Sequence, residues 1–495
     1  MYKRQAHIRE NRCPAVVCSA FFKTPCMHAC PINMDIPSYL ALIKADRLED
    51  AYKVLLKTNP FPSICGRVCD HKCETKCRRS TLDEAVSIKY LKRYITDNAA
   101  RPRTAKAPLT RREKIAVIGA GPSGLTAAKD LTLRGYAVTL FDEYPEAGGM
   151  LRWGIPAYRL PREILDREIA DILALGVEFR NRTKVGRDVS WEDVRKNFDA
   201  VYLAIGAQRS ARSGLAGDEL EGVEGAIEFL REVNLGKKPK VGKRVAVIGG
   251  GNSAVDAARS ALRLGAEMVT IVYRRLREDM PAQDDEIHAA QAEGIKMEFL
   301  AVPIRFQGTN GRLQSVICQR MTLGEFDEGG RRKPTPKIGD EMTPAVDQVI
   351  LAIGQEAEYP FDIAKAGVKL SKRKLIETVK GKKTATAAPM IFAGGDVVTG
   401  PDTVVGAVAA GHNAAREIDD AIRQRNEEAP YIPVEEEIEI PMILEEETQE
   451  APRVCIPEVA CLERIGDFRE VELGFSKKEA LEEASRCLRC DIEIE

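Results

Sequence analysis

The chain lacks a long apolar run and an excess of charge of either sign. No apolar stretch approaches the roughly 20 residues that cross a bilayer, and residues 1–13 lack the apolar core of a signal peptide. The 74 Lys and Arg residues balance 75 Asp and Glu residues, which does not favour a nucleic-acid partner. These absences predict a cytoplasmic protein with no membrane span.

Histidine is also scarce. The five histidines are scattered along the sequence, and no Ser/His/Asp arrangement is evident. We therefore predict no catalytic acid–base residue and interpret the histidines as surface or packing residues: His7, His28, His71, His288 and His412.

Cysteine, in contrast, is plentiful and clustered. Of 13 cysteines, eight precede residue 80 and four follow residue 450, with Cys318 alone between them. In a cytoplasmic chain such clusters indicate metal or cluster ligands rather than disulfides. Cys318 lies in a segment of alternating polarity, 313–320, which predicts a core residue of a strand.

The 495 residues exceed what one core accommodates, so two or three domains are expected. Residues 36–56 carry apolar side chains at helical spacing, and 99–110 have the composition of a linker. Buried-strand patterns at 115–118 and 245–248 each run into a glycine turn and a helix. A repeated strand–glycine–helix pattern predicts an α/β protein with two nucleotide-binding domains.

The first glycine turn has the full dinucleotide fingerprint. Its first glycine makes the turn, the second admits a pyrophosphate to the backbone, and the third lets helix and strand pack. The next strand, 138–141, ends at Asp142, a carboxylate that suits a ribose 2′-hydroxyl. The predicted cofactor-binding residues here are Gly119, Gly121, Pro122, Ser123, Gly124 and Asp142.

The second turn ends differently. Its third glycine is alanine, and Arg274 and Arg275 stand where the first copy has its acidic residue. Guanidinium groups suit a 2′-phosphate, which favours NADPH over NADH. The alternative is that both arginines belong to a solvated basic patch. The predicted nicotinamide-nucleotide residues are Gly249, Gly251, Asn252, Ser253, Arg274 and Arg275.

The N-terminal cysteines have iron–sulfur spacing. A Cys-x3-Cys-Pro run at 26–31 is similar to the end of a ferredoxin motif, and four cysteines follow at intervals of four residues from 65 to 77. Eight thiolates match two four-ligand clusters, with structural zinc as the alternative. The predicted ligands are Cys13, Cys18, Cys26, Cys30, Cys65, Cys69, Cys73 and Cys77.

Several further motifs carry a family resemblance. They are GGMLRWGIP at 148–156, RLP at 159–161, YRR at 273–275 before MPA at 280–282, AGGD at 393–396, and GP at 400–401 before 404–410. To about residue 425 the chain resembles the small subunit of NADPH-dependent glutamate synthase. It is equally similar to the flavin domains of dihydropyrimidine dehydrogenase and to the large subunit of NADH-dependent ferredoxin:NADP oxidoreductase.

This resemblance implies an oxidoreductase in which a hydride passes from NADPH to FAD, and single electrons then pass through two 4Fe-4S clusters. It places FAD at the first fingerprint and NADPH at the second, with the NADPH domain inserted into the FAD domain. Such chemistry needs no acid–base dyad. Further cofactor residues implied by the resemblance are Gly149, Arg152, Gly354, Gly395, Asp396, Thr403 and Val404.

The resemblance also divides the cluster ligands. One cluster would take Cys13, Cys18, Cys26 and Cys77, and the other Cys30, Cys69 and Cys73 with a Gln or Glu from the following helix. Lys92 stands at that Gln or Glu position here, and an ammonium group cannot ligate iron. We therefore take Cys65 as the candidate fourth ligand.

The C-terminus carries a second cysteine group, in which Cys455, Cys461, Cys487 and Cys490 form a candidate third site for an iron–sulfur cluster or zinc. Unpaired packing cysteines are the alternative. An acidic stretch precedes the group, and a helix with a Ser476–Glu479 capping box is expected near its end.

The expected domain order follows from these motifs. We expect a helical double-cluster domain at 1–100, a linker at 101–112, the FAD domain at 113–235 and 346–425, the inserted NAD(P)H domain at 236–345, and the acidic C-terminal segment at 426–495.

The expected partners are a nicotinamide nucleotide and a redox subunit or ferredoxin. An alternative role is in an electron-bifurcating transhydrogenase, hydrogenase or formate-dehydrogenase complex. A remote alternative is a non-catalytic zinc-binding scaffold.

Overall fold

The computed structural model describes residues 24–326, 332–433, 436–442 and 449–492. Its N-terminal part is helical, and the segment 36–56, with its apolar residues at helical spacing, forms parts of two helices. The break falls at Asp46, whose φ of 57° lies in the left-handed region. The elements are α2 (Pro25–Ala29), α3 (Ile36–Lys44), α4 (Leu48–Thr58), α5 (Pro62–Val68), η1 (Glu74–Lys76), η2 (Arg78–Thr81) and α6 (Ile88–Asn98).

A five-stranded parallel sheet follows, with strand order β15-β4-β1-β2-β3. The edge strand β15 comes from much later in the chain than the other four strands. The first nucleotide domain is therefore interrupted by the second. The elements are β1 (Lys114–Ile118), α7 (Pro122–Leu133), β2 (Ala137–Phe141), α8 (Met150–Trp153), α9 (Arg162–Ala174), β3 (Glu178–Arg180), α10 (Trp191–Asn197), β4 (Ala200–Leu203), β15 (Ile391–Ala393), α14 (Asp396–Thr399) and α15 (Val404–Arg425).

The inserted part has its own parallel sheet, with order β6-β13-β7-β8-β9, and an antiparallel sheet of β10, β11 and β12 at its side. Cys318 is fully buried in β11, as predicted. The elements are β6 (Val223–Gly225), α11 (Ala226–Asn234), β7 (Arg244–Ile248), α12 (Asn252–Arg263), β8 (Met268–Tyr273), η3 (Arg277–Asp279), α13 (Asp284–Ala292), β9 (Lys296–Phe299), β10 (Ala301–Thr309), β11 (Arg312–Phe326), β12 (Arg332–Met342) and β13 (Gln348–Leu351).

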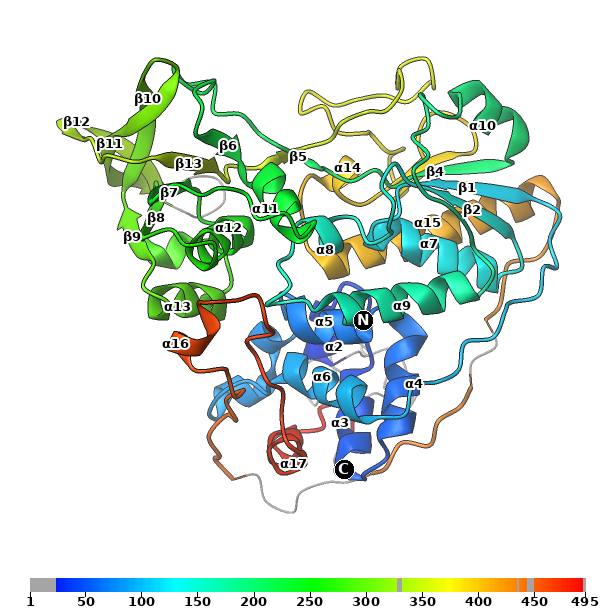
Figure 1. Ribbon diagram of the computed structural model, residues 1–495. Helices are drawn as coiled ribbons and strands as arrows, with labels where there is room; N and C mark the ends of the chain where they lie inside the picture. Colours follow the sequence, from blue (N-terminus) through cyan, green and yellow to red (C-terminus); the bar gives the residue numbers. More distant parts are fainter. Residues whose placement is uncertain (1–23, 327–331, 434–435, 443–448, 493–495) are drawn as a thin grey trace.

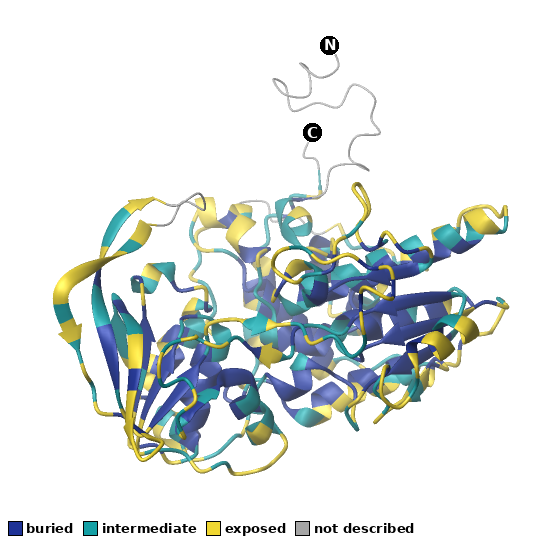
Figure 2. Cartoon of the chain, turned by 90° about the horizontal axis from the view of Figure 1, so that it is seen from above, coloured by how far each residue is buried: buried dark blue, intermediate teal, exposed yellow. Residues whose placement is uncertain are grey.

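The chain passes between the two nucleotide domains twice, and the two crossings lie side by side. At one crossing is β5 (Arg209–Ser210) and at the other is β14 (Gln355–Glu356), and they pair antiparallel. Both parallel sheets are buried, whereas the antiparallel sheet is largely exposed (Figure 2). The nested α/β architecture predicted from the sequence is therefore confirmed.

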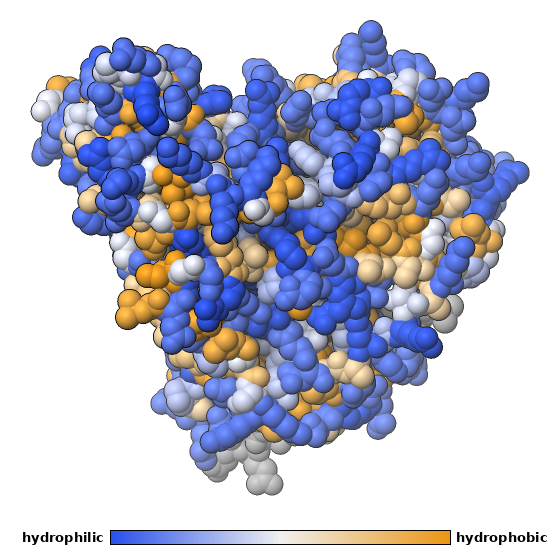
Figure 3. All heavy atoms as spheres, viewed as in Figure 1, coloured by the Kyte–Doolittle hydropathy of each residue, from blue (hydrophilic) through white to orange (hydrophobic). Residues whose placement is uncertain are grey.

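The C-terminal segment returns to the N-terminal helices (Figure 1). It contains α16 (Cys461–Arg464), beside α13, and α17 (Lys477–Ser485), which packs on α3 and α6. The predicted capping box of Ser476 and Glu479 is present. Hydrophilic residues cover much of the molecular face in Figure 3. Within the described ranges, no helix is long and apolar enough to cross a membrane.

Candidate flavin, nicotinamide and iron–sulfur sites

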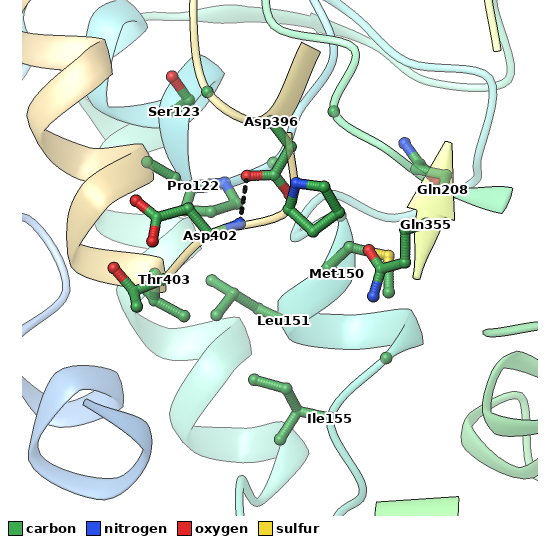
Figure 4. A pocket seen from close by; sticks show the side chains of 18 of the residues that line it. Pro122, Ser123, Met150, Leu151, Ile155, Gln208, Gln355, Asp396, Asp402 and Thr403 are labelled. Atoms are coloured by element: carbon green, nitrogen blue, oxygen red, sulfur yellow. Dashed lines mark hydrogen bonds between the residues drawn. The ribbon is translucent and has the colours of Figure 1, made fainter. Parts of the chain in front are cut away.

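One pocket joins the two nucleotide domains at the ends of their parallel strands, the usual ligand position in such sheets. Figure 4 shows polar groups from the loops near β15 together with apolar side chains of α8 around the hollow. Both fingerprints contribute to its wall. Its lining includes Gly121, Pro122, Ser123, Gly149, Asn252, Ser253, Gly395, Asp396, Thr403 and Val404.

The first glycine turn is shaped for close contacts. A Cβ on Gly124 would lie 1.9 Å from the Gly119 carbonyl oxygen, and one on Gly149 would lie 2.7 Å from the Gly121 Cα. Helix α7 begins after Gly121 with no side-chain cap. Backbone N–H groups at such a helix start attract a phosphate, so this turn fits a pyrophosphate.

A second cavity lies at the end of β2. It is lined by Gly119 and Asp142, and it shares Ile205 and Gln208 with the first pocket. Asp142 accepts hydrogen bonds from the N–H groups of Ala120 (2.7 Å) and Tyr144 (2.9 Å). Burial raises the pKa of Asp142 to about 6. The two adjoining hollows fit the two halves of a dinucleotide.

Asp396 stands at the start of α14 and faces the first pocket (Figure 4). Its carboxylate accepts the N–H of Asp402 at 3.3 Å, and burial raises the pKa of Asp396 to about 7. Thr403 caps α15 by accepting the N–H of Gly406 at 3.1 Å. The start of α15 thus presents an ordered N-terminus to the pocket.

A cavity lined by Cys30, Cys69 and Cys73 lies next to this pocket. Tyr39 lines it and is fully buried, and its hydroxyl has no hydrogen-bond partner among the described residues. Such a donor fits the sulfur atoms of a cluster, so the residues present suit an iron–sulfur group. Lys92 also lines the cavity, and the four nearby thiols that raise its pKa against the effect of burial are Cys30, Cys65, Cys69 and Cys73.

The cysteine cavity adjoins the flavin pocket directly. Asp70 lines both hollows, while the successive residues Val404 and Val405 line one each. Val68, on the other side of Cys69, also lines the pocket. The start of α15 and the Cys69 loop are therefore the wall between the two sites.

Comparisons with known proteins agree with this geometry. Residues 113–411 match the family model described as pyridine nucleotide-disulphide oxidoreductase. The chain belongs to this family. Residues 1–104 match a second model, dihydropyrimidine dehydrogenase domain II, 4Fe-4S cluster. The chain is an NADPH-dependent flavin and 4Fe-4S oxidoreductase, as predicted.

Individual relatives cover most of the chain. NADPH-Fe(3+) oxidoreductase subunit beta of Geobacter sulfurreducens is 40% identical over 95% of this chain and 75% of the relative. NADP(+)-dependent formate dehydrogenase subunit beta of Moorella thermoacetica is 41% identical over 95% and 71%. The glutamate synthase [NADPH] small chain of Escherichia coli is 38% identical over 79% and 87%. The resemblance to that family is confirmed.

A solved structure supports the fold alone. FprA of Mycobacterium tuberculosis, in complex with NADPH, matches with a TM-score of 0.56 and 19% identity, covering 65% of this chain and 88% of that one.

Some predicted cofactor residues of this oxidoreductase lie outside the linings of both hollows. Arg152 is buried, donates to the Ala147 carbonyl at 2.7 Å and pairs with Glu146 and Asp166. Gly249 makes a close turn, because a Cβ there would lie 2.3 Å from the Ala352 carbonyl oxygen. The others outside the linings are Gly124, Gly251, Arg274, Arg275 and Gly354.

The predicted cysteine ligands at the N-terminus differ in whether the structure describes them and in how far they are buried. Cys13 and Cys18 lie outside the described residues. Cys65 is fully buried near Cys69 and Lys92, and its thiol lies 3.8 Å from the Asn59 side-chain oxygen. Burial raises the pKa of Cys65 to about 12. Among the described residues, no group of three or more His, Cys, Asp or Glu side chains is arranged to hold a single metal ion.

The four C-terminal cysteines are the candidate third site. Cys461 lies against α13, with its sulfur 3.0 Å from the Ala292 carbonyl oxygen, and Cys455 is exposed. Cys487 instead packs against the core that also contacts Cys26 and Cys77. Within the described residues the four C-terminal cysteines thus meet different surroundings, and the candidate third site stays a prediction.

One ion pair in the wall of the pocket, between Arg159 and Asp256, was not predicted from the sequence. Arg159 lies before α9 and donates to both carboxylate oxygens of Asp256, on α12, at 2.9 and 3.0 Å. Both residues line the pocket. Arg159 belongs to a motif seen in the sequence, but its partner Asp256 lies 97 residues further along the chain and no local pattern indicates the contact.

Proposed function

We propose that this chain takes electrons from NADPH and delivers them, one at a time, to a redox partner through two 4Fe-4S clusters. The observation that carries the proposal is the shared wall between the flavin pocket and the cavity of Cys30, Cys69 and Cys73. When bound, FAD accepts a hydride from NADPH, and the clusters carry single electrons.

The residues around the pocket have complementary roles in this proposal. The N–H groups after Gly121 hold the pyrophosphate of FAD, and Asp142 holds its ribose. Asp396 and the start of α15 bind the part of FAD nearer the ring. Met150, Leu151 and Ile155 supply apolar surface that keeps water from the reacting face.

The second fingerprint binds NADPH in the proposal. Helix α12 also begins without a side-chain cap, after Gly251, which suits a phosphate. Arg274 is exposed after β8 and is the candidate partner of the 2′-phosphate. Arg275 is buried there and is proposed to support the same loop. We place this nucleotide domain at 236–345, inside an FAD domain at 113–235 and 346–425.

The partner is proposed to be another subunit of a cytoplasmic redox complex, or a ferredoxin. The relatives from G. sulfurreducens and M. thermoacetica are named as beta subunits, and they match this chain over 95% of its length. That coverage is too high to leave out the whole C-terminal segment, and it favours a complex of the formate-dehydrogenase or iron-reducing kind over glutamate synthase, whose small chain matches 79%.

Metal and flavin analysis of the protein, purified without oxygen, tests the proposal. We expect about eight irons with matching sulfide and one FAD per chain. NADPH should bleach the flavin faster than NADH does. Zinc without sulfide, or a flavin that neither nucleotide reduces, would contradict the proposal.

A further inference from the structure

Four cysteine thiols from the two ends of the chain lie near one another. Cys26 belongs to α2 and Cys77 follows η1, while Cys487 and Cys490 follow α17. Helix α2 packs on η1. Cys26, Cys77 and Cys487 all pack against the same apolar core. Each thiol is partly buried.

The C-terminal pair is held in place by a buried polar network. Glu483, on α17, accepts the N–H groups of Ser87 at 2.7 Å and Val454 at 2.8 Å. Arg486 donates to Asp83 at 2.9 Å, and Arg79 donates to the Arg486 carbonyl at 3.3 Å. These bonds connect the residue before Cys487 to the segment that follows Cys77.

The segment that carries the pair is itself tightly turned. The N–H of Cys487 donates to the Ala484 carbonyl at 3.2 Å, and Arg489 adopts a left-handed φ of 46°. Two thiolates separated by two residues are a common pair of ligands for one cluster.

A four-iron cluster suits this set better than zinc does. A tetrahedral zinc with bonds of about 2.3 Å draws its sulfurs to about 3.8 Å from one another. The described residues contain no group arranged to hold one metal ion in that way. A four-iron cluster lies between its thiolates and keeps them further apart.

We propose that Cys26, Cys77, Cys487 and Cys490 ligate one 4Fe-4S cluster, so that the C-terminal Cys-x2-Cys pair, and not Cys13 and Cys18, completes it. The inference rests on the two-cluster function proposed above and names the ligands of one cluster. The C-terminal segment then supplies two of the four ligands, so that the cluster links the two ends of the chain. Cys455 and Cys461 take no part in it.

Three double variants of the full chain test the assignment by iron and sulfide content. Cys487→Ser/Cys490→Ser should lose about four irons per chain. Cys455→Ser/Cys461→Ser removes two cysteines from the same segment, and Cys13→Ser/Cys18→Ser removes the competing pair; both should keep all iron. Bound FAD, measured in each preparation, reports that the chain is folded.

The single variant Cys490→Ser gives a second measurement, in case the double variant does not fold. A serine ligand should change the electron paramagnetic resonance signal of one cluster, whereas Cys461→Ser should leave both signals unchanged. Full iron in Cys487→Ser/Cys490→Ser would overturn the assignment, as would loss of four irons from Cys13→Ser/Cys18→Ser. A wild-type protein without iron would instead refute the two-cluster function.

Discussion

The flavin half, built on the sheet of β1, and the nicotinamide half, built on the sheet of β7, each contain a strand, a glycine turn and a helix in succession. They are joined to the rest of the molecule in different ways. The flavin half shares one continuous apolar core with the N-terminal helices, in which Leu40, Ile64 and Leu91 belong to the same cluster as Leu125 and Leu165. The nicotinamide half has apolar cores of its own, built around β7, β8 and β13.

Charged contacts attach the nicotinamide half to its surroundings. Arg159 pairs with Asp256 at 2.9 Å, Lys89 with Asp285 at 3.4 Å, and Arg464 with Glu293 at 3.0 Å. Packing thus sets the position of the flavin site relative to the cysteines. Directional polar contacts hold the half that we propose to bind NADPH.

The largest effect is expected where the two glycine turns differ. Gly124→Ala would place a Cβ 1.9 Å from the Gly119 carbonyl oxygen, whereas the second copy already carries Ala254 at the matching position. Gly124→Ala should therefore lose bound FAD almost completely while keeping its iron. Absorbance spectra and iron analysis measure both.

Ala254→Gly is the matched control for this comparison. Glycine near a helix start costs at most about 1 kcal/mol, so this variant should keep its FAD and bind NADPH nearly as before. A Gly124→Ala protein with one FAD per chain would show that the two turns are equally tolerant.

The next effect concerns the ion pair between the halves. Arg159→Ala leaves Asp256 buried without its cation, and the loss of one partner of such a pair costs about 3–5 kcal/mol. We expect a lower midpoint of denaturation and slower flavin reduction by NADPH, with FAD and iron retained. Arg187→Ala, which removes an exposed ion pair with Asp188, should change neither. Unaltered reduction by Arg159→Ala would mean that the contact does not position the nicotinamide half.

A buried polar contact between the flavin half and the N-terminal helices gives a pH-dependent effect. Glu168, on α9, accepts the N–H groups of Ser63 at 2.6 Å and Ile64 at 3.1 Å, at the start of α5. Burial raises its pKa from 4.5 to about 7. The folded protein therefore binds this proton more tightly than the unfolded chain does. Stability should fall by about 3 kcal/mol as the pH rises from about 4.5 to 7.

Glu168→Gln should remove this part of the pH dependence, which denaturation midpoints between pH 4.5 and 7 would show. Glu163→Gln changes an exposed carboxylate on the same helix and should keep the wild-type slope. If Glu168→Gln also kept that slope, the carboxyl group would have to ionise normally in the folded protein.

The sequence predicted the elements whose signals are local. Both fingerprints, the strands that follow them and the capping box at Ser476 depend on spacing within a few residues. The break between α3 and α4 could not be predicted, because Asp46 turns the chain without a nearby Gly or Pro. The approach of Cys487 to Cys26 could not be predicted either, since it depends on contacts across more than 400 residues of chain, such as that between Arg486 and Asp83.

The smallest effect concerns the ends of the second strands, where Asp142 in the flavin half corresponds to Arg274 in the nicotinamide half. Arg274 is exposed, so its replacement should disturb no packing. If it binds the 2′-phosphate, Arg274→Ala should raise the KM for NADPH about tenfold, equivalent to about 1.4 kcal/mol, and leave the KM for NADH unchanged. Arg277→Ala, which removes a nearby cation already paired with Asp284, should not change the ratio of the two KM values. An unchanged ratio in Arg274→Ala would return this arginine to the solvated surface and leave the NADPH preference to other residues of the loop.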